Sequence, residues 1–113
     1  MEPHALRKDE WQRTAAELSR RRAGWFVSAE EQVRSLSEDD VETSMLVEER
    51  PFRALVWRDG RLVLEYEGDR ELERLAVERP AAWSRLENEA GGADHLRVED
   101  AEGRTTVLAF RRP

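Results

Sequence analysis

The chain has 113 residues and a mass of 13.2 kDa, which fits one domain over residues 1–113. It has no cysteine, and this excludes a disulfide scaffold, a cysteine-ligated metal site and a thiol nucleophile. Its net charge is −6, and no apolar run approaches the roughly 20 residues that a membrane span needs. The first residues also lack the charged head and apolar stretch of a signal peptide, so we expect a cytoplasmic protein with no membrane partner.

The first element that the sequence predicts is an amphipathic helix over about residues 8–23. Trp11, Ala15 and Leu18 recur at helical spacing and form an apolar stripe. The basic run Arg20-Arg21-Arg22 falls in the last turn, where it matches the helix dipole. Gly24 follows, and glycine readily adopts the left-handed conformation that ends many helices. The helix should therefore end there and bury the face that carries Trp11.

After the helix, a strand is predicted from Trp25, and the chain then becomes strongly acidic. Residues 28–50 hold eight acidic and two basic side chains, so this segment alone accounts for the net charge. We interpret residues 29–43, which have few apolar side chains, as a long loop. The loop lacks the alternating acids and the glycine of a calcium site, so no metal is expected. Its most acidic part is a candidate surface for a basic protein partner and comprises Glu38, Asp39, Asp40 and Glu42.

Antiparallel strands are predicted over about residues 44–111. The clearest signal is a hairpin in which residues 52–57 and 62–66 flank Asp59-Gly60, a pair suited to the positive φ angles of a tight turn. Another strand is expected over 72–77. The last two strands, 95–99 and 105–110, are joined by a turn in which Gly103 is suited to positive φ.

Residues 80–90 fit two secondary structures. Pro80 at a first helical position, Trp83 and Leu86 at helical spacing, and the glycines that follow all favour a short helix. A strand would place Trp83 on the same face as Arg85 and Glu87, which is a poor pattern for a buried surface. From the residues alone, the helix is the better fit.

Short motifs follow one another along most of the chain in an order that a known family also shows. They are Glu10-Trp11, Ser19-Arg20-Arg21, Gly24-Trp25, Pro51-Phe52-Arg53-Ala54, Arg79-Pro80 with Trp83, and residues 98–105. In this order the chain resembles a family of small bacterial proteins, the domain of unknown function 5335 family. That family usually has glycine where Ala54 stands, and segment 30–43 is more acidic here. The resemblance implies a strand after Pro80, so helix and strand both stay open for 81–90, and it implies no activity and no catalytic residue.

The chain has four tryptophans, of which Trp11 and Trp25 are expected in the core. Trp57 has two interpretations. Strict alternation along residues 52–57 places it on one face with Arg53 and Leu55. Either this face is also covered and Trp57 belongs to the core, or the three side chains form an exposed contact patch. Tryptophan and arginine are the residues most enriched at binding hot spots, so Trp57, Arg53 and Leu55 are candidate site residues.

Few side chains are suited to catalysis. The histidines are His4 and His95, no serine has a nucleophile-elbow context, and no phosphate-binding glycine pattern occurs. Without a nucleophile–base pair, the sequence argues against an enzyme and indicates no cofactor. Two arginine clusters, Arg20-Arg21-Arg22 and Arg111-Arg112, would form an anion site if the last strand ended near the helix; a helix-dipole role and a solvated tail are the simpler interpretation.

These features predict an α+β domain, in which an N-terminal helix packs on a strongly bent antiparallel sheet of five to seven strands. The sheet is either open or closed into a small Sm- or SH3-like barrel. The leading functional hypothesis is a non-catalytic module that binds a protein, or a second copy, through a sheet edge or the Trp57 face. A tryptophan-lined small-molecule pocket and an Sm-like RNA-binding face are the alternatives. Nucleic acid is disfavoured as a partner because its binding needs a net basic face.

Overall fold

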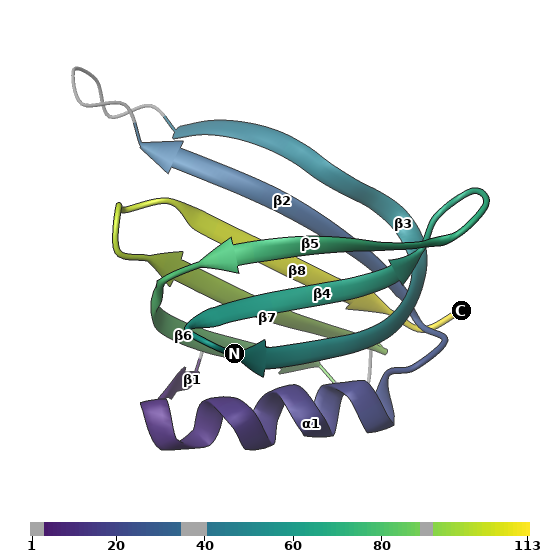
Figure 1. Cartoon of the computed structure of the whole chain (residues 1–113), viewed down its shortest axis with the longest axis horizontal. Coiled ribbons are helices and arrows are strands. Elements are labelled where there is room, and N and C mark those ends of the chain that lie inside the picture. The colour runs from purple at the N-terminus through teal and green to yellow at the C-terminus, as the bar shows by residue number, and fades with distance from the viewer. Residues whose placement is uncertain (1–3, 35–40, 89–91) are drawn as a thin grey trace.

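One helix and eight strands form the part of the chain that the computed structural model describes, residues 4–34, 41–88 and 92–113 (Figure 1). The fold is α+β and is dominated by its antiparallel sheet, which has eight strands where five to seven were expected. Within these residues, no helix has the length and apolar character to cross a membrane. In chain order the elements are β1 (His4–Leu6), the 3-10 turn η1 (Lys8–Glu10), α1 (Trp11–Arg21), β2 (Phe26–Arg34), β3 (Val41–Arg58), β4 (Arg61–Glu67), β5 (Leu72–Glu78), β6 (Pro80–Asn88), β7 (Ala93–Asp100) and β8 (Thr105–Arg111).

The sheet bends sharply within β3, its longest strand. The N-terminal part of β3 pairs with β2, and the part from Phe52 onward pairs with β4. At the end of the first part lie Glu49, which has a positive φ of 41°, and Pro51, which is the last residue paired with β2 and has no N–H to donate to a ladder. Because of this bend, β4 and β5 turn back over the remaining strands, and the sheet encloses one core from two sides (Figure 1).

The sheet does not close into a barrel. Its strand order is β1-β6-β7-β8-β2-β3-β4-β5, so β1 and β5 are the two ends. In the described parts of the chain, no strand pairs with the outer edge of β5. The structure is therefore an open half-barrel, and the closed form that the sequence left open is not adopted.

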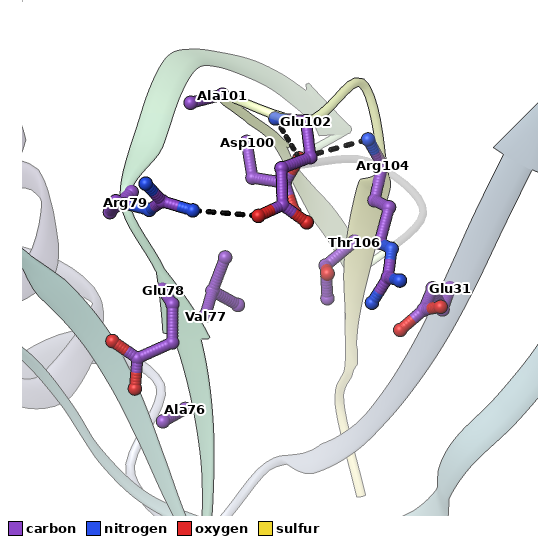
Figure 2. A pocket seen from close by; sticks show the side chains of 10 residues that line it. All are labelled: Glu31, Ala76, Val77, Glu78, Arg79, Asp100, Ala101, Glu102, Arg104 and Thr106. Carbon is purple, nitrogen blue, oxygen red and sulfur yellow. Dashed lines mark hydrogen bonds and ion pairs between the residues drawn. The ribbon is translucent and has the colours of Figure 1, made fainter.

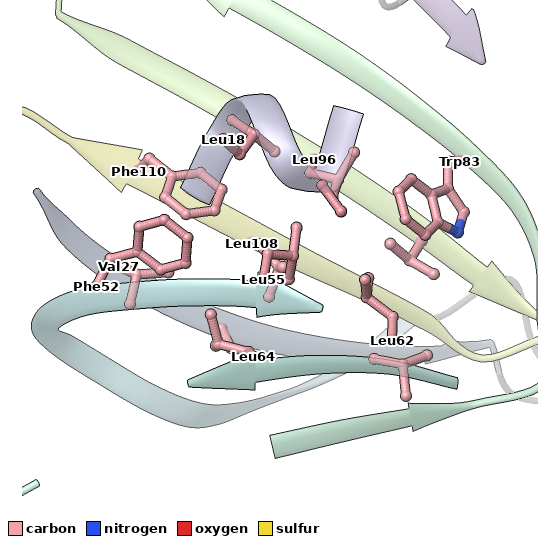
Figure 3. Close-up of a cluster of buried hydrophobic side chains, with 14 of the residues drawn as sticks. Leu18, Val27, Phe52, Leu55, Leu62, Leu64, Trp83, Leu96, Leu108 and Phe110 are labelled. Carbon is pink, nitrogen blue, oxygen red and sulfur yellow. The ribbon is translucent and has the colours of Figure 1, made fainter. Parts of the chain in front are cut away.

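The inner face of the half-barrel and one face of α1 form the hydrophobic core. Its largest buried rings are Trp11 on α1, Trp83 on β6, and Phe52 and Phe110, whose ring centroids lie 4.8 Å apart in an edge-to-face contact. Leucines and valines from β2, β3, β4, β7 and β8 fill the space between the rings (Figure 3). In a chain of this size such rings supply a large share of the apolar area that folding buries.

Helix α1 lies within the range predicted for it, and η1 occupies the first residues of that range. Trp11, Ala15 and Leu18 are buried, as the helical spacing predicted, and Thr14 is buried beside them. Beyond the helix, Gly24 has a φ of 87°, a conformation that a side chain would strain. The chain then turns directly into β2.

Both predicted hairpin turns are confirmed. Asp59 and Gly60 have φ angles of 55° and 76°, which is the geometry of a tight two-residue turn between β3 and β4. Gly103, in the turn between β7 and β8, has a φ of 86°. The Asp100 carboxylate supports this turn by accepting hydrogen bonds from the backbone N–H groups of Glu102 and Arg104, each at 2.9 Å.

Two segments differ from their expected secondary structure. Residues 29–43, interpreted as a loop, are strand on both sides of residues 35–40, which lie outside the described part of the chain. Residues 30–32 pair with both β3 and β8, and this pairing holds the segment extended although its side chains are polar. Residues 80–88, for which helix and strand were both open, form β6, which pairs with β7 and with the unexpected strand β1.

Candidate functional site

The three side chains of the predicted contact patch do not form one. Arg53 is exposed, but Leu55 is only 3 % exposed and Trp57 packs partly buried against the core. The predicted alternation was wrong because the β3–β4 register shifts between Phe52 and Ala54, where β3 carries an extra residue. After this bulge, Leu55 and Trp57 face inward on the same side as Phe52, and Arg53 alone faces the solvent.

Trp57 belongs to a cluster of three indoles between α1, β3 and β6. The Trp11 and Trp83 rings are stacked, with centroids 4.8 Å apart and planes 3° apart. Trp57 lies edge-to-face against both, at 5.4 and 6.0 Å. The indole N–H groups of Trp11 and Trp83 are buried and have no nitrogen or oxygen acceptor among the described residues. The cluster is a packed part of the core and not a contact surface.

The predicted acidic partner loop is only partly within the described structure. Glu38, Asp39 and Asp40 lie outside the described residues. Glu42 is exposed near the start of β3, on a regular strand that pairs with β2. The acidic residue that the structure does place is therefore part of a sheet and not of a loop.

The N-terminal part of β3 has an open edge. From Val41 to Glu49 it pairs with β2 on one side, and no described residue pairs with its backbone on the other. We call this open side of Val41–Glu49 the β3 edge. Of the four exposed large hydrophobic residues in the described structure, three belong to it: Val41, Met45 and Leu46, with exposed fractions of 48, 58 and 41 %. An open strand with apolar side chains is a template for pairing with another chain.

The two faces of the β3 edge differ in chemistry. Ala29 on β2 is buried in the core, so the next residue, Glu30, points away from the core, and its cross-strand partner Met45 shares that outer face. Because successive side chains of a strand point to opposite faces, the position of Met45 also fixes the faces of the residues before it. The outer face carries Val41, Thr43 and Met45, and the inner face carries Glu42 and Ser44. From Val41 to Met45 the outer face is therefore uncharged, whereas the inner face bears a carboxylate.

The C-terminal part of β3 has no such opening on the side away from β4, because α1 covers it. The Ser19 hydroxyl accepts a hydrogen bond from the Leu55 amide at 2.8 Å and lies 3.0 Å from the Leu55 carbonyl oxygen. It also lies 2.9 Å from the carbonyl oxygen of Ala15 within the helix. One helix side chain thus satisfies the backbone of β3 where a neighbouring strand would otherwise pair.

A cleft of about 480 Å³ opens between β5 and the strands β2 and β8 (Figure 2). It lies beside the β3 edge, since Glu31 on its wall is the cross-strand partner of Ser44. Its size suits a small ligand, but its lining is charged and contains no tryptophan, unlike the pocket considered from the sequence. The ionisable side chains of the lining are Glu31, Glu78, Arg79, Asp100, Glu102 and Arg104.

An ion pair next to one end of the β3 edge joins β3 to the β4–β5 loop. Arg50 Nη1 lies 2.7 Å from Asp69 Oδ1. The hydrogen bond from Arg50, and then its charge, lower the pKa of Asp69, and the same contact raises the pKa of Arg50. The pair lies just beyond Glu49. The Glu49 end of the β3 edge is therefore near the β4–β5 loop, and the Val41 end is distant from it.

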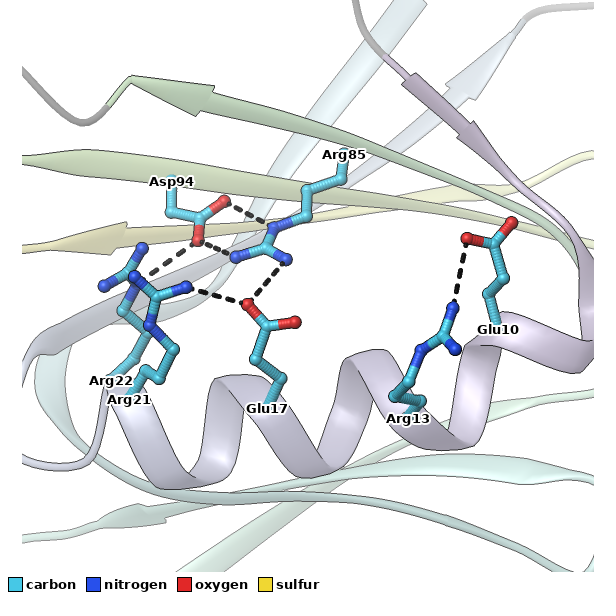
Figure 4. A network of polar contacts seen from close by, with 7 residues as sticks. All are labelled: Glu10, Arg13, Glu17, Arg21, Arg22, Arg85 and Asp94. Atoms are coloured by element: carbon cyan, nitrogen blue, oxygen red, sulfur yellow. Dashed lines mark hydrogen bonds and ion pairs between the residues drawn. The ribbon is translucent and has the colours of Figure 1, made fainter.

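A buried polar network ties the end of α1 to β6 and β7 (Figure 4). The Asp94 carboxylate is 1 % exposed and accepts from Arg22 Nε at 3.2 Å and from Arg85 Nη2 at 2.8 Å. Arg85 also contacts Glu17, which in turn accepts from Arg21 at 3.0 Å. Burial alone would raise the pKa of Glu17, but the hydrogen bonds and charges of the two arginines outweigh it and lower that pKa.

The two arginine clusters meet, as the sequence allowed. The guanidinium carbon of Arg22 lies 4.3 Å from the centroid of the Trp25 ring, and that of Arg112 lies 5.5 Å from it. Arg22 is bonded to Asp94, and Arg111 pairs with Glu49. With Arg21, which pairs with Glu17, three arginines of the two clusters have carboxylate partners, which favours a structural role for the clusters over an anion site.

A metal-binding cluster does not assemble in the described residues. No three acidic or histidine side chains there lie close enough together to hold a metal ion. Both histidines are exposed, His4 on β1 and His95 on β7. What the residues do offer is an open, partly apolar strand edge beside a charged cleft.

The sequence reasoning missed the β3 edge. A signal was present in the run Thr43 to Val47, which is rich in apolar and β-branched residues and precedes Pro51. The loop interpretation of residues 29–43 separated Val41 and Glu42 from this run.

Comparisons of the chain with protein-family models, with curated proteins and with solved structures found no match. The likeness to the domain of unknown function 5335 family therefore stays a prediction.

Proposed function

We propose that this protein is a non-catalytic protein-binding module that receives an extended segment of a partner along the β3 edge. The observation that carries the proposal is the open backbone of Val41–Glu49 together with its exposed apolar side chains. Strand addition of this kind obtains affinity from main-chain hydrogen bonds and specificity from alternate side chains.

Other edges of the sheet support binding less well. The edge of β5 is also open, but Leu72 is its one exposed large hydrophobic residue in the described structure. The end strand β1 has three residues, too few for a stable ladder. Natural proteins shield open edges with charge or keep them short. The β3 edge has nine residues, and its glutamates leave three apolar side chains exposed beside them.

A relation to the Sm- and SH3-like barrels is a separate prediction. It is supported by the strong bend of the sheet within β3. The binding proposal does not depend on it, because it uses an edge that a closed barrel would lack.

The proposal can be tested with a library of random ten-residue peptides displayed to the immobilised protein. The wild type should enrich peptides rich in β-branched residues. A triple variant, Val41→Ser, Met45→Ser and Leu46→Ser, removes the exposed apolar groups while it leaves the core and the charge unchanged, and it should lose this enrichment.

A matched control is Leu72→Ser, which removes an apolar side chain of similar exposure from the β5 edge. It should keep the enrichment. If no peptide is enriched on the wild type, or if the triple variant enriches the same peptides as the wild type, the β3 edge is not a binding site.

A further inference from the structure

We infer that the occupant of the β3 edge is a basic amphipathic strand, in which arginine or lysine alternates with apolar residues. This inference rests on the proposed function and adds the chemistry of the partner. It follows from the two faces of the edge, which the cross-strand register defines.

The outer face of the β3 edge favours apolar side chains in the added strand. A strand added to the β3 edge places every second side chain beside Val41, Thr43 and Met45. Val41 and Met45 are about half exposed, so an apolar neighbour removes their surface from water.

The inner face of the β3 edge favours cationic side chains in the added strand. The remaining side chains of the added strand lie beside Glu42 and Ser44, and one strand further on stands Glu31 in the wall of the charged cleft. Four carboxylates and two guanidinium groups line that cleft, so its charge has the same sign as that of the inner face. Opposite charges directly across a strand pair are favourable, whereas like charges are unfavourable.

The charge of the whole segment points to the same occupant. Residues 28–50 carry a formal charge of −6, and this excess attracts a basic segment and speeds its association. It also disfavours a second copy of the chain as the occupant, because pairing two β3 edges would bring two such segments together.

Fluorescence anisotropy with three labelled eight-residue peptides tests the inference. The first alternates Arg with Val, the second alternates Glu with Val, and the third is the Arg–Val peptide with every second backbone amide N-methylated. N-methylation keeps charge and side chains but removes the donors that strand pairing needs. We expect the wild type to bind the first peptide at least tenfold more tightly than the other two, with an affinity that falls as salt rises.

Variants of the protein test whether the inner face of the β3 edge recognises the charge of the peptide. Glu42→Lys should weaken binding of the Arg–Val peptide about tenfold and strengthen binding of the Glu–Val peptide. Asp9→Lys makes the same charge change at an exposed position in η1, before helix α1 and away from the β3 edge, and should change both affinities less than threefold.

The outcomes separate this inference from the proposed function. Equal binding of the Arg–Val and Glu–Val peptides, or equal effects of the two lysine variants, would overturn the basic partner and leave strand addition intact. Equal binding of the N-methylated peptide would mean that charge alone attracts the peptide, which would overturn the paired strand. A dimer in light scattering that the triple serine variant dissociates would make a second copy the occupant and overturn the inference. If the peptide library yields no enriched peptide on the wild type, the proposed function itself is wrong.

Discussion

The Ser19 hydroxyl lies 2.8 Å from the backbone nitrogen of Leu55 and 3.0 Å from its carbonyl oxygen. Through this contact, α1 takes the place of a neighbouring strand along the second half of β3. The first half, Val41–Glu49, has no equivalent cover among the described residues. One strand is thus closed at one end and open at the other, and the open end is the proposed binding site.

Ser19→Ala should destabilise the protein by about 1–3 kcal/mol, because it leaves the Leu55 amide without its acceptor in a part-buried place. Urea denaturation measures the loss, and amide hydrogen exchange at Leu55 should become faster. Ser28→Ala is the matched control, since Ser28 accepts the Glu49 amide at an exposed site where water can replace it. Equal losses in the two variants would show that Ser19 has no special role at this edge.

Asp94→Asn should cost about 3–5 kcal/mol, because it removes the charged carboxylate that Arg22 and Arg85 share in the buried network. Thermal and urea denaturation measure the loss. The control is Glu67→Gln, which removes a carboxylate that pairs with Arg53 at the surface and should cost less than about 1 kcal/mol. An Asp94→Asn variant as stable as the wild type would show that the network does not hold α1 to the sheet.

The ion pairs of Glu17 should make part of the stability depend on pH. The folded pKa of Glu17 is lowered, so its contribution is fully present above its unfolded pKa and is lost as the pH falls through the folded value. The difference in unfolding free energy between wild type and Glu17→Gln should therefore shrink on going from pH 6 to pH 3. In an Arg21→Gln background, which lacks one partner of Glu17, this pH-dependent difference should be smaller. A difference that stays constant with pH would contradict the assignment.

Local sterics made some parts of the fold predictable. Gly24, Gly60 and Gly103 all have positive φ, and each marks a turn that the sequence alone located. The helix was predictable for a related reason, since Trp11 and Leu18 share one face at helical spacing whatever surrounds them.

Features that depend on distant strands were not predictable. Glu30 and Glu31 lie in a strand because β3 and β8 pair with them from both sides. The side chains of this segment do not indicate that pairing in the sequence. The bulge at Arg53 likewise reverses the faces of β3 through its register with β4. An open edge is harder still to predict, because it is defined by the strand that is missing beside it.

Substitution of Trp57 tests directly whether the bulge at Arg53 turns this side chain towards the core. Its ring contacts those of Trp11 and Trp83, so Trp57→Ala should lower the unfolding free energy by about 3 kcal/mol and change the near-ultraviolet circular dichroism of the cluster. Arg53→Ala is the control, because its exposed pair with Glu67 should cost less than about 1 kcal/mol. A contact patch would show the opposite pattern, in which Trp57→Ala leaves stability unchanged and abolishes peptide binding. If the β3 edge is the site, Trp57→Ala instead weakens the fold, and peptide affinity of the folded fraction stays within threefold of the wild type.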